Sequence, residues 1–219
     1  MIKALIFDLD GTLANTEIMH HRAWEKALLD NGVSKLPFET FMPYIGTSNE
    51  KIAGDYIESD SISKEIAELV REKQTIFMDL IPEIQLFQGA RKIIERYHST
   101  LHLAIASSSH RQEIMLLLKS QQLDSYFDLI IGGDMVRQRK PDPEIYLKVQ
   151  QLLGFAPQEC IAFEDSEHGL NSAKNAGMYG VAIPNEFTMN HNFSRADLIL
   201  TGLAEMDDKK ISELLQNRP

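Results

Sequence analysis

The sequence contains a single cysteine, Cys160, among its 219 residues. No intrachain disulfide can therefore form, and this cysteine usage is typical of a protein kept in a reducing compartment. No apolar run approaches the roughly 20 residues that a membrane-spanning helix needs, and the apolar stretch 2–7 is too short for the core of a signal peptide. We therefore expect a cytoplasmic protein that does not bind membranes.

Basic runs are also missing, and the chain carries a formal net charge of −10. Nucleic-acid-binding proteins normally carry a basic patch, so we expect no nucleic-acid partner. The overall charge should repel an anionic ligand, which means that any anion site must be made locally by a metal ion, a lysine or backbone N–H groups. The length suits one large domain or one domain with an insertion, and neither internal repeats nor low-complexity tracts are present.

The stretch from Ile6 to Thr12 reads IFDLDGT and organises the rest of the chain. Residues 2–7 predict a buried strand of a parallel sheet, and Asp8 and Asp10 follow where that strand should end. Ligands of open α/β sheets bind beyond the carboxyl ends of the strands. Two carboxylates this close repel each other unless they share a cation or a proton, so we expect a site for a hard cation with one carboxylate free to act as a nucleophile. Taken alone, the motif also fits a solvated turn or part of a calcium loop, although the residues after Gly11 lack the further acids of an EF-hand.

The periodicity of apolar residues changes along the chain. Helices are predicted at 17–31, from a cap at Ser48 through Ile57, and from a cap at Ser63 to about Leu80. Beyond Gln88 we expect strands at 101–106, 129–131, 160–163, 180–183 and 198–200, alternating with helices at 89–97, 110–118, 143–153, 166–176 and from about 204 onward. This pattern predicts an α/β protein with a Rossmann-like parallel sheet flanked by helices and an inserted α-helical cap domain. We assign residues 1–15 and 82–219 to the core domain and 16–81 to the cap, which would close over substrate as a lid.

Three further segments place polar residues beside predicted strand ends. Ser107 and Ser108 follow strand 101–106 and could bind an anion, or could simply cap the next helix. Lys140 stands between Arg139 and Pro141, where it could deliver a charge to a phosphoryl group or could be an ordinary surface lysine. Glu164-Asp165 follows strand 160–163. In a doubly wound sheet, ligands bind where the strand order reverses, and the order that works places this strand beside the first one. Four carboxylates then converge, and such a group needs a divalent cation.

These segments, centred on Asp8, Ser107, Lys140 and Glu164-Asp165, resemble the four motifs of the haloacid-dehalogenase superfamily of phosphohydrolases, in the family's order and spacing. The resemblance covers essentially the whole chain and implies a Mg²⁺-dependent enzyme. It implies that Asp8 is the nucleophile and forms an aspartyl-phosphate, while Asp10 acts as acid and base. It also implies that Mg²⁺ is held by Asp8, the Asp10 backbone carbonyl, Asp165 and, directly or indirectly, Glu164. The phosphoryl group would be held by residues of the second and third motifs: Ser107, Ser108 and Lys140.

Within the family the chain is most similar to β-phosphoglucomutase and to the sugar-phosphate and phosphoglycolate phosphatases that share its cap. The segment from His20 to Trp24 matches the mutase's first cap helix, but the loop 46–49 offers Asn49 where the mutase has an arginine, and Asn15 replaces an aspartate. A phosphatase acting on a small phosphorylated metabolite is therefore expected, with a sugar phosphomutase as the alternative and a catalytically silent binding protein as a lesser one. Asp10 argues against dehalogenation. Further substrate contacts are expected from His20, Thr47 and Arg111, and we expect a monomer or a weak dimer.

Overall fold

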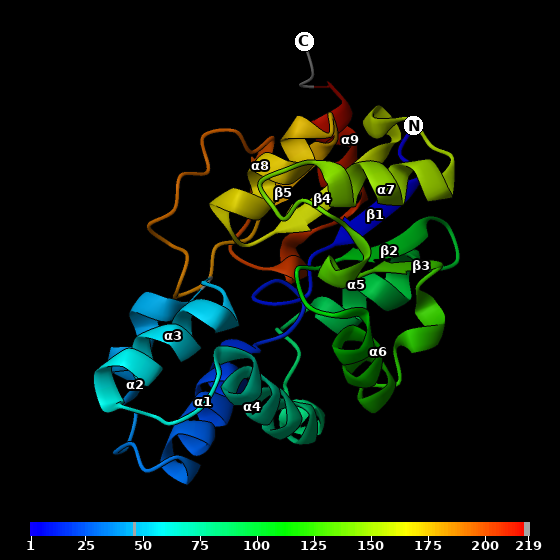
Figure 1. The fold of residues 1–219 in the computed structure, drawn as a ribbon. Helices are drawn as coiled ribbons and strands as arrows, with labels where there is room; N and C mark the ends of the chain where they lie inside the picture. Colours follow the sequence, from blue (N-terminus) through cyan, green and yellow to red (C-terminus); the bar gives the residue numbers. More distant parts are fainter. Residues whose placement is uncertain (46, 217–219) are drawn as a thin grey trace. The chain divides into compact units, whose positions relative to one another are not determined.

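The computed structural model of the protein describes residues 1–45 and 47–216, so Gly46 of the predicted loop lies outside the described residues (Figure 1). The chain forms two compact units. One consists of Met1–Asn15 together with Gln85–Pro219, and the other of Thr16–Ile84. The first is an α/β unit and the second is helical.

The α/β unit is built on one parallel sheet of six strands in the order β3-β2-β1-β4-β5-β6. The strands are β1 (Ala4–Phe7), β2 (His102–Ala106), β3 (Leu129–Ile131), β4 (Cys160–Glu164), β5 (Tyr179–Ala182) and β6 (Leu198–Ile199). Parallel strands need crossover connections, and helices supply all of them here except the one from β5 to β6, which is an irregular loop. The predicted fold class is therefore confirmed.

Strand β1 lies at the centre of this sheet, and the strand order reverses beside it. The chain runs from β1 to β2 and β3 on one side and then returns to place β4 on the other. Phe7 pairs in register with Ile105 of β2 and with Phe163 of β4. The residues that follow these strands consequently meet at the same edge, in the crevice where open α/β sheets bind ligands.

Successive side chains of a strand point to opposite sides of the sheet, and in β1 and β4 the side chains on both sides are buried. On one face, Ile6 belongs to an apolar cluster with residues of β2, β4 and two helices that includes Ala104, Ile145, Tyr146, Val149, Ala162 and Ala173. On the other face, Phe7 stacks on Phe163 with ring centroids 4.8 Å apart. This packing holds the ends of β1 and β4 in fixed register.

In the described part of this unit, up to residue 216, five α-helices accompany the sheet: α5 (Ala90–Tyr97), α6 (Arg111–Ser120), α7 (Glu144–Leu153), α8 (Glu167–Asn175) and α9 (Asp208–Gln216). The prediction that the last helix begins near residue 204 was wrong, because Leu203–Glu205 forms a separate 3-10 turn and Met206 is extended. The side chain of Asp207 accepts a hydrogen bond from Lys210 N at 2.9 Å, which is the arrangement of a helix N-cap. The helix therefore begins after Asp207.

The helical unit contains α1 (Glu17–Asp30), α2 (Phe38–Phe41), α3 (Asn49–Asp60) and α4 (Ile66–Leu80), with 3-10 turns at Met42–Tyr44 and Ile81–Glu83. The predicted cap at Ser48 is confirmed, since its hydroxyl accepts from Lys51 N at 3.2 Å. The predicted cap at Ser63 was wrong. Ile62 is buried in the core of this unit and Lys64 N donates to Ile62 O, so the chain is still turning at Ser63, and Glu65 is the residue that precedes α4. Among the described residues, no helix has the combination of length and apolar character needed to cross a membrane.

The two chain segments that join the units run side by side within the α/β unit. Asn15 N donates to Gln85 O at 3.0 Å, and Phe87 N donates to Leu13 O at 2.9 Å. Ala14 and Leu86 form an isolated antiparallel bridge between them. The chain thus leaves the α/β unit and re-enters it at adjacent points.

Candidate active site

Three acidic side chains gather where β1 and β4 end. Asp8 follows β1, Glu164 is the last residue of β4, and Asp165 comes next. One carboxylate oxygen from each lies within 4.8 Å of the other two, and all three residues are at most 7% exposed. The predicted convergence of the two strand ends is confirmed by the pairing of β1 with β4.

Lys140 connects two of these acids from the loop before α7. Its Nζ donates to Asp8 Oδ1 at 2.6 Å, to Glu164 Oε1 at 2.7 Å and to the backbone carbonyl of Ala106 at 2.8 Å. Burial disfavours the charged form of Lys140, but Asp8 and Glu164 outweigh burial and raise its pKa. The structure therefore places this lysine inside the site as a fixed positive charge.

The charge of the acidic group is not balanced by Lys140 alone. Burial raises the pKa of the Asp8 carboxyl well above its usual range; Lys140 opposes this, whereas Glu164, Asp10 and Asp165 add to it. Closely spaced carboxylates keep their charge when a cation is shared between them. The ligand atoms are all oxygen, which is the preference of hard divalent cations such as Mg²⁺. The residues present therefore fit a divalent metal ion.

The expectation that four carboxylates converge was wrong for Asp10, whose carboxylate is not in this group and contacts residues beyond the end of β2. Its Oδ2 accepts from the hydroxyls of Ser107 at 2.9 Å and Ser109 at 2.7 Å. Ser107 Oγ in turn accepts from Ser109 N at 3.0 Å. Ser109 was not predicted, although its position two residues beyond Ser107 at the same strand end was an available signal.

Tyr146 is a second contact that sequence reasoning missed. It lies in the first turn of α7 and is fully buried. Its hydroxyl donates a hydrogen bond to Glu164 Oε1, the oxygen that also accepts from Lys140. Burial, followed by the negative charge of Glu164, raises the pKa of Tyr146 well above its usual range, so the phenol keeps the proton that it donates. Glu164 is thereby held at one oxygen by two donors.

Gly169, in the first turn of α8, leaves the space that the Glu164 side chain occupies. A Cβ atom at this position would lie 1.9 Å from Glu164 Oε2. The carboxylate cannot easily move aside, because Lys140 and Tyr146 hold its other oxygen. The absence of a side chain at Gly169 is therefore part of the construction of the site.

We expect Gly169→Ala to lower the free energy of unfolding by about 1–3 kcal/mol relative to the same substitution at a helix glycine that has free space, because the new methyl overpacks the site. Gly54→Ala is the matched control. A Cβ there meets only Ile66 Cδ1 at 3.6 Å, so this change should stabilise α3 by up to about 1 kcal/mol. Urea unfolding of both variants and the parent measures the difference, and equal stability of the two variants would contradict the expectation.

The remaining predicted residues of the α/β unit, Ser108 and Arg111, are exposed. Ser108 follows Ser107 directly, and Arg111 begins α6 with its backbone N–H donating to Asp134 Oδ1 at 2.9 Å. Their predicted contact with substrate stays a prediction.

Within the helical unit, the predicted residues His20 and Thr47 have different surroundings. Thr47 is exposed and its hydroxyl donates to Tyr44 O at 2.7 Å. His20 of α1 stacks on Phe77 of α4, with ring centroids 4.0 Å apart, and its Nδ1 lies 2.8 Å from Lys73 Nζ. Burial, together with the charge of Lys73, holds the pKa of His20 well below its usual range. The ring is therefore neutral and accepts the lysine's hydrogen bond.

Lys73 was not predicted and is the largest omission in this unit. It is fully buried on α4, between His20 and Asn49, and its Nζ donates to Asn49 Oδ1 at 3.2 Å. Leu69, Lys73 and Phe77 are spaced by four residues on the buried stripe of this helix. A lysine within an apolar helical stripe is the signal that could have found it.

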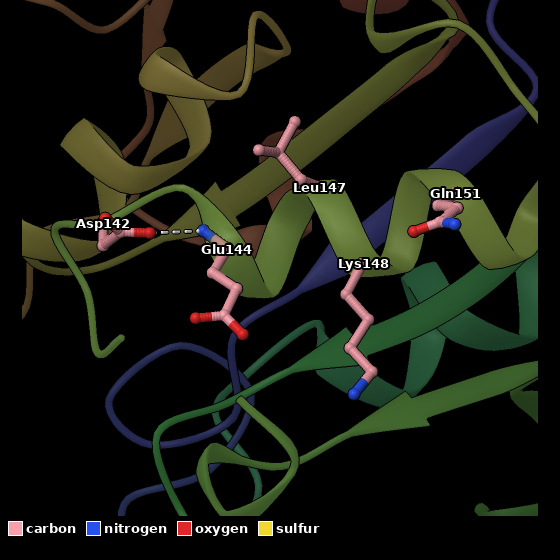
Figure 2. Close-up of a pocket in the computed structure, with 5 residues that line it drawn as sticks. All are labelled: Asp142, Glu144, Leu147, Lys148 and Gln151. Atoms are coloured by element: carbon pink, nitrogen blue, oxygen red, sulfur yellow. Dashed lines mark hydrogen bonds between the residues drawn. The ribbon is translucent and has the colours of Figure 1, made fainter. Parts of the chain in front are cut away.

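A hollow on α7 lies apart from this chemistry (Figure 2). Its lining comes from the loop before the helix and from the helix surface: Asp142, Glu144, Leu147, Lys148 and Gln151. Glu144 accepts from the backbone N–H groups of Arg137 and Gln138 and so holds the preceding loop, whereas Asp142 accepts from Glu144 N, the first N–H of the helix. We assign no chemistry to this hollow.

Comparison with known proteins places the site in a family context. The family model described as haloacid dehalogenase-like hydrolase matches residues 5–183. Protein CbbY of Rhodobacter capsulatus is 35% identical, with 97% of this chain and 99% of the relative aligned. A phosphorylated carbohydrates phosphatase of Thermotoga maritima is 32% identical, with 82% of this chain and 85% of the relative aligned.

Two solved structures are similar to this chain over almost its full length. A mutant of CbbY from Rhodobacter sphaeroides, in complex with xylulose-(1,5)bisphosphate, superposes with a TM-score of 0.84 at 31% identity and covers 94% of this chain and 96% of that chain. A β-phosphoglucomutase from Clostridium difficile superposes with a TM-score of 0.80 at 25% identity and covers 99% of this chain and 98% of that chain. The similarity to both kinds of protein that was inferred from the motifs is confirmed.

Proposed function

Because this chain belongs to the haloacid dehalogenase-like hydrolase family, we propose that it is a Mg²⁺-dependent phosphatase of a small sugar phosphate or a similar monoester. The observation that carries the proposal is the group of Asp8, Glu164 and Asp165 at the point where the strand order of the sheet reverses. Lys140 donates a hydrogen bond to Asp8 within this group. A phosphatase of phosphorylated carbohydrates among its relatives and a sugar bisphosphate bound to a structural neighbour support this substrate class.

We propose that Mg²⁺ is held by the carboxylates of Asp8 and Asp165 and by the backbone carbonyl of Asp10, with Glu164 as a further ligand, direct or through water. When bound, the ion offsets the negative charge of the phosphoryl group and orients it. Lys140 adds a positive charge beside Asp8. Together these charges allow a carboxylate to approach an anionic substrate that it would otherwise repel.

In the first half of the proposed reaction, a carboxylate oxygen of Asp8 attacks phosphorus. The bond between phosphorus and the ester oxygen breaks, and Asp10 gives that oxygen its proton. In the second half, Asp10 takes a proton from water, the water oxygen attacks phosphorus, and the bond to Asp8 breaks. Ser107 and Ser109 hold the Asp10 carboxylate at 2.9 and 2.7 Å, which supports this role by fixing the direction in which its proton is delivered.

We propose that the helical unit is the cap domain predicted from the sequence at residues 16–81, with the compact unit extending to Ile84. Its buried Lys73, beside His20 and Asn49, is a positive charge of the kind that can bind an anionic group of a substrate. This observation also favours a second candidate function, a sugar phosphomutase, because such an enzyme must hold two phosphates. Asn49, the first residue of α3, stands where the mutase has an arginine, so the phosphatase remains our first proposal.

The test is a panel of phosphorylated metabolites assayed for inorganic phosphate with and without Mg²⁺. We expect phosphate release from sugar phosphates, its loss on chelation, and its recovery when Mg²⁺ is returned, because the acidic group needs the cation to accept a phosphoryl group. Turnover that survives exhaustive chelation would contradict the metal assignment. Conversion of β-glucose 1-phosphate to the 6-phosphate without free phosphate would show that the second candidate is correct.

A further inference from the structure

Asn185 lies just beyond β5, outside the four motifs that place the chain in its family. Its side-chain Nδ2 donates to Asp165 Oδ2 at 2.8 Å and to the backbone carbonyl of Gly11 at 3.1 Å. One amide therefore joins the acid that follows β4 to the turn that follows β1.

The orientation of this amide is determined by the loop that carries it. Asn185 Oδ1 accepts from the backbone N–H of Phe187 at 2.8 Å, and Asn185 N donates to Thr188 Oγ1 at 3.0 Å. A backbone N–H can only donate, so the amide oxygen must face Phe187 and the NH₂ group must face Asp165. Both N–H bonds of that group then have an acceptor.

The contact is also close-packed. Gly11 has a φ of +79°, and a Cβ there would lie 2.3 Å from Asp165 Oδ2 and 2.9 Å from Asn185 Nδ2. The Asp165 carboxylate therefore rests directly against the glycine of the first motif, with the amide holding it in place. A carboxylate kept this way has little freedom to rotate out of the group formed with Asp8 and Glu164.

Asn185 does this without adding charge. Lys140 holds Asp8 and Glu164 with a positive charge, which would compete with a bound cation if it were repeated at Asp165. A neutral amide supplies two donors and leaves the negative charge of Asp165 available to a cation. Lys140 is thus suited to the phosphate side of the site, and Asn185 to the metal side.

We infer that Asn185 is a positioning residue of the metal site, which holds Asp165 in the direction needed to bind Mg²⁺; this inference rests on the proposed function. Residues that orient metal ligands typically change metal affinity by about 10- to 100-fold when they are replaced. We therefore expect the same range for loss of the Asn185 amide.

The experiment is calorimetric titration of the full-length protein with Mg²⁺ in the absence of substrate. Asn185→Ser keeps a short oxygen that can accept from Phe187 N, so the turn is retained, but it cannot reach Asp165. Asn192→Ser is the matched control, because Asn192 Oδ1 accepts from Ser194 N at 3.0 Å in the same kind of turn on the same loop. We expect the dissociation constant of Mg²⁺ to rise about 10- to 100-fold for Asn185→Ser and to change less than twofold for Asn192→Ser.

The outcomes separate the inference from the proposed function. Mg²⁺ binding by the parent with unchanged affinity in Asn185→Ser would overturn the inference alone. If the parent does not bind Mg²⁺, the proposed metal site is wrong and the inference falls with it. Thermal unfolding in chelator shows whether Asn185→Ser is folded; if it is not, Asn185→Gln carries the test, since its longer side chain displaces the NH₂ group and should weaken Mg²⁺ binding in the same direction.

Discussion

Asp8→Asn is expected to abolish phosphate release, with a loss of at least about 10⁴-fold, because an amide does not replace the attacking carboxylate. Asn can still accept from Lys140 at the position of Oδ1, so the fold should be retained. No phosphate should become attached to the variant when it is mixed with an aryl or acyl phosphate. Measurement of released phosphate and the intact mass of the protein check the two parts of this expectation.

The matched control for Asp8→Asn is Asp128→Asn. Asp128 is half-exposed, lies before β3 at the opposite edge of the sheet, and pairs with His102 at 3.1 Å. This substitution removes the same charge from the chain, and the amide oxygen can still accept from Leu103 N, so the activity should stay within about twofold of the parent. Equal losses in both variants would show that net charge, and not the nucleophile, is what matters.

Asp10→Asn is expected to lower turnover of alkyl phosphates by about 10²- to 10⁴-fold, which is the usual contribution of general acid–base catalysis. The amide oxygen can still accept from Ser107 and Ser109, and the backbone carbonyl that we assign to Mg²⁺ is unchanged. Mg²⁺ binding should therefore survive. An aryl phosphate has a leaving group that needs no proton, so the first step should suffer less than the second, and phosphate should accumulate on Asp8.

Mass spectrometry of Asp10→Asn after mixing with an aryl or acyl phosphate detects this intermediate. The double variant Asp8→Asn/Asp10→Asn is the control and should trap nothing, which assigns the phosphate to Asp8. If Asp10→Asn traps no phosphate and turns over an alkyl phosphate normally, Asp10 is not the acid–base residue.

The convergence of Asp8 with Glu164 and Asp165 could be predicted from the sequence because it follows from local patterns and one rule of geometry. Each acid comes directly after a short apolar run, and parallel strands bring their carboxyl ends to one edge. The strand order that makes β1 and β4 neighbours was expected on this ground, and the structure has it.

Contacts made by single side chains outside the sequence motifs could not be predicted in the same way. Tyr146 stands beside Ile145 in an apolar stripe and looks like a core residue until the position of Glu164 is known. Asn185 lies in a loop with no periodicity, and its partner Asp165 is 20 residues away along the chain. Such contacts depend on how α7 and the loop after β5 pack on the sheet, which no local pattern determines.

Two helix starts were misplaced for a related reason. Ser63 has the chemistry of a cap, but burial of Ile62 keeps the chain turning beyond it and moves the start of α4 to Ile66. The segment after Gly202 is apolar enough for a helix to begin there. It forms only a 3-10 turn, and α9 begins after the cap at Asp207. In both places a tertiary contact or a competing cap decided between local alternatives of similar propensity.

The paired linkers make the helical unit exchangeable. Because Asn15 and Gln85 are hydrogen-bonded neighbours at 3.0 Å, the α/β unit already holds together the two ends between which any inserted segment must fit. The length of an insertion then adds only a slowly rising entropy of loop closure and does not strain the sheet. Residues 16–84 can therefore be exchanged for another folded module while the strand ends that carry Asp8, Glu164 and Asp165 are kept, and under the cap role that we propose such an exchange changes which molecules are selected.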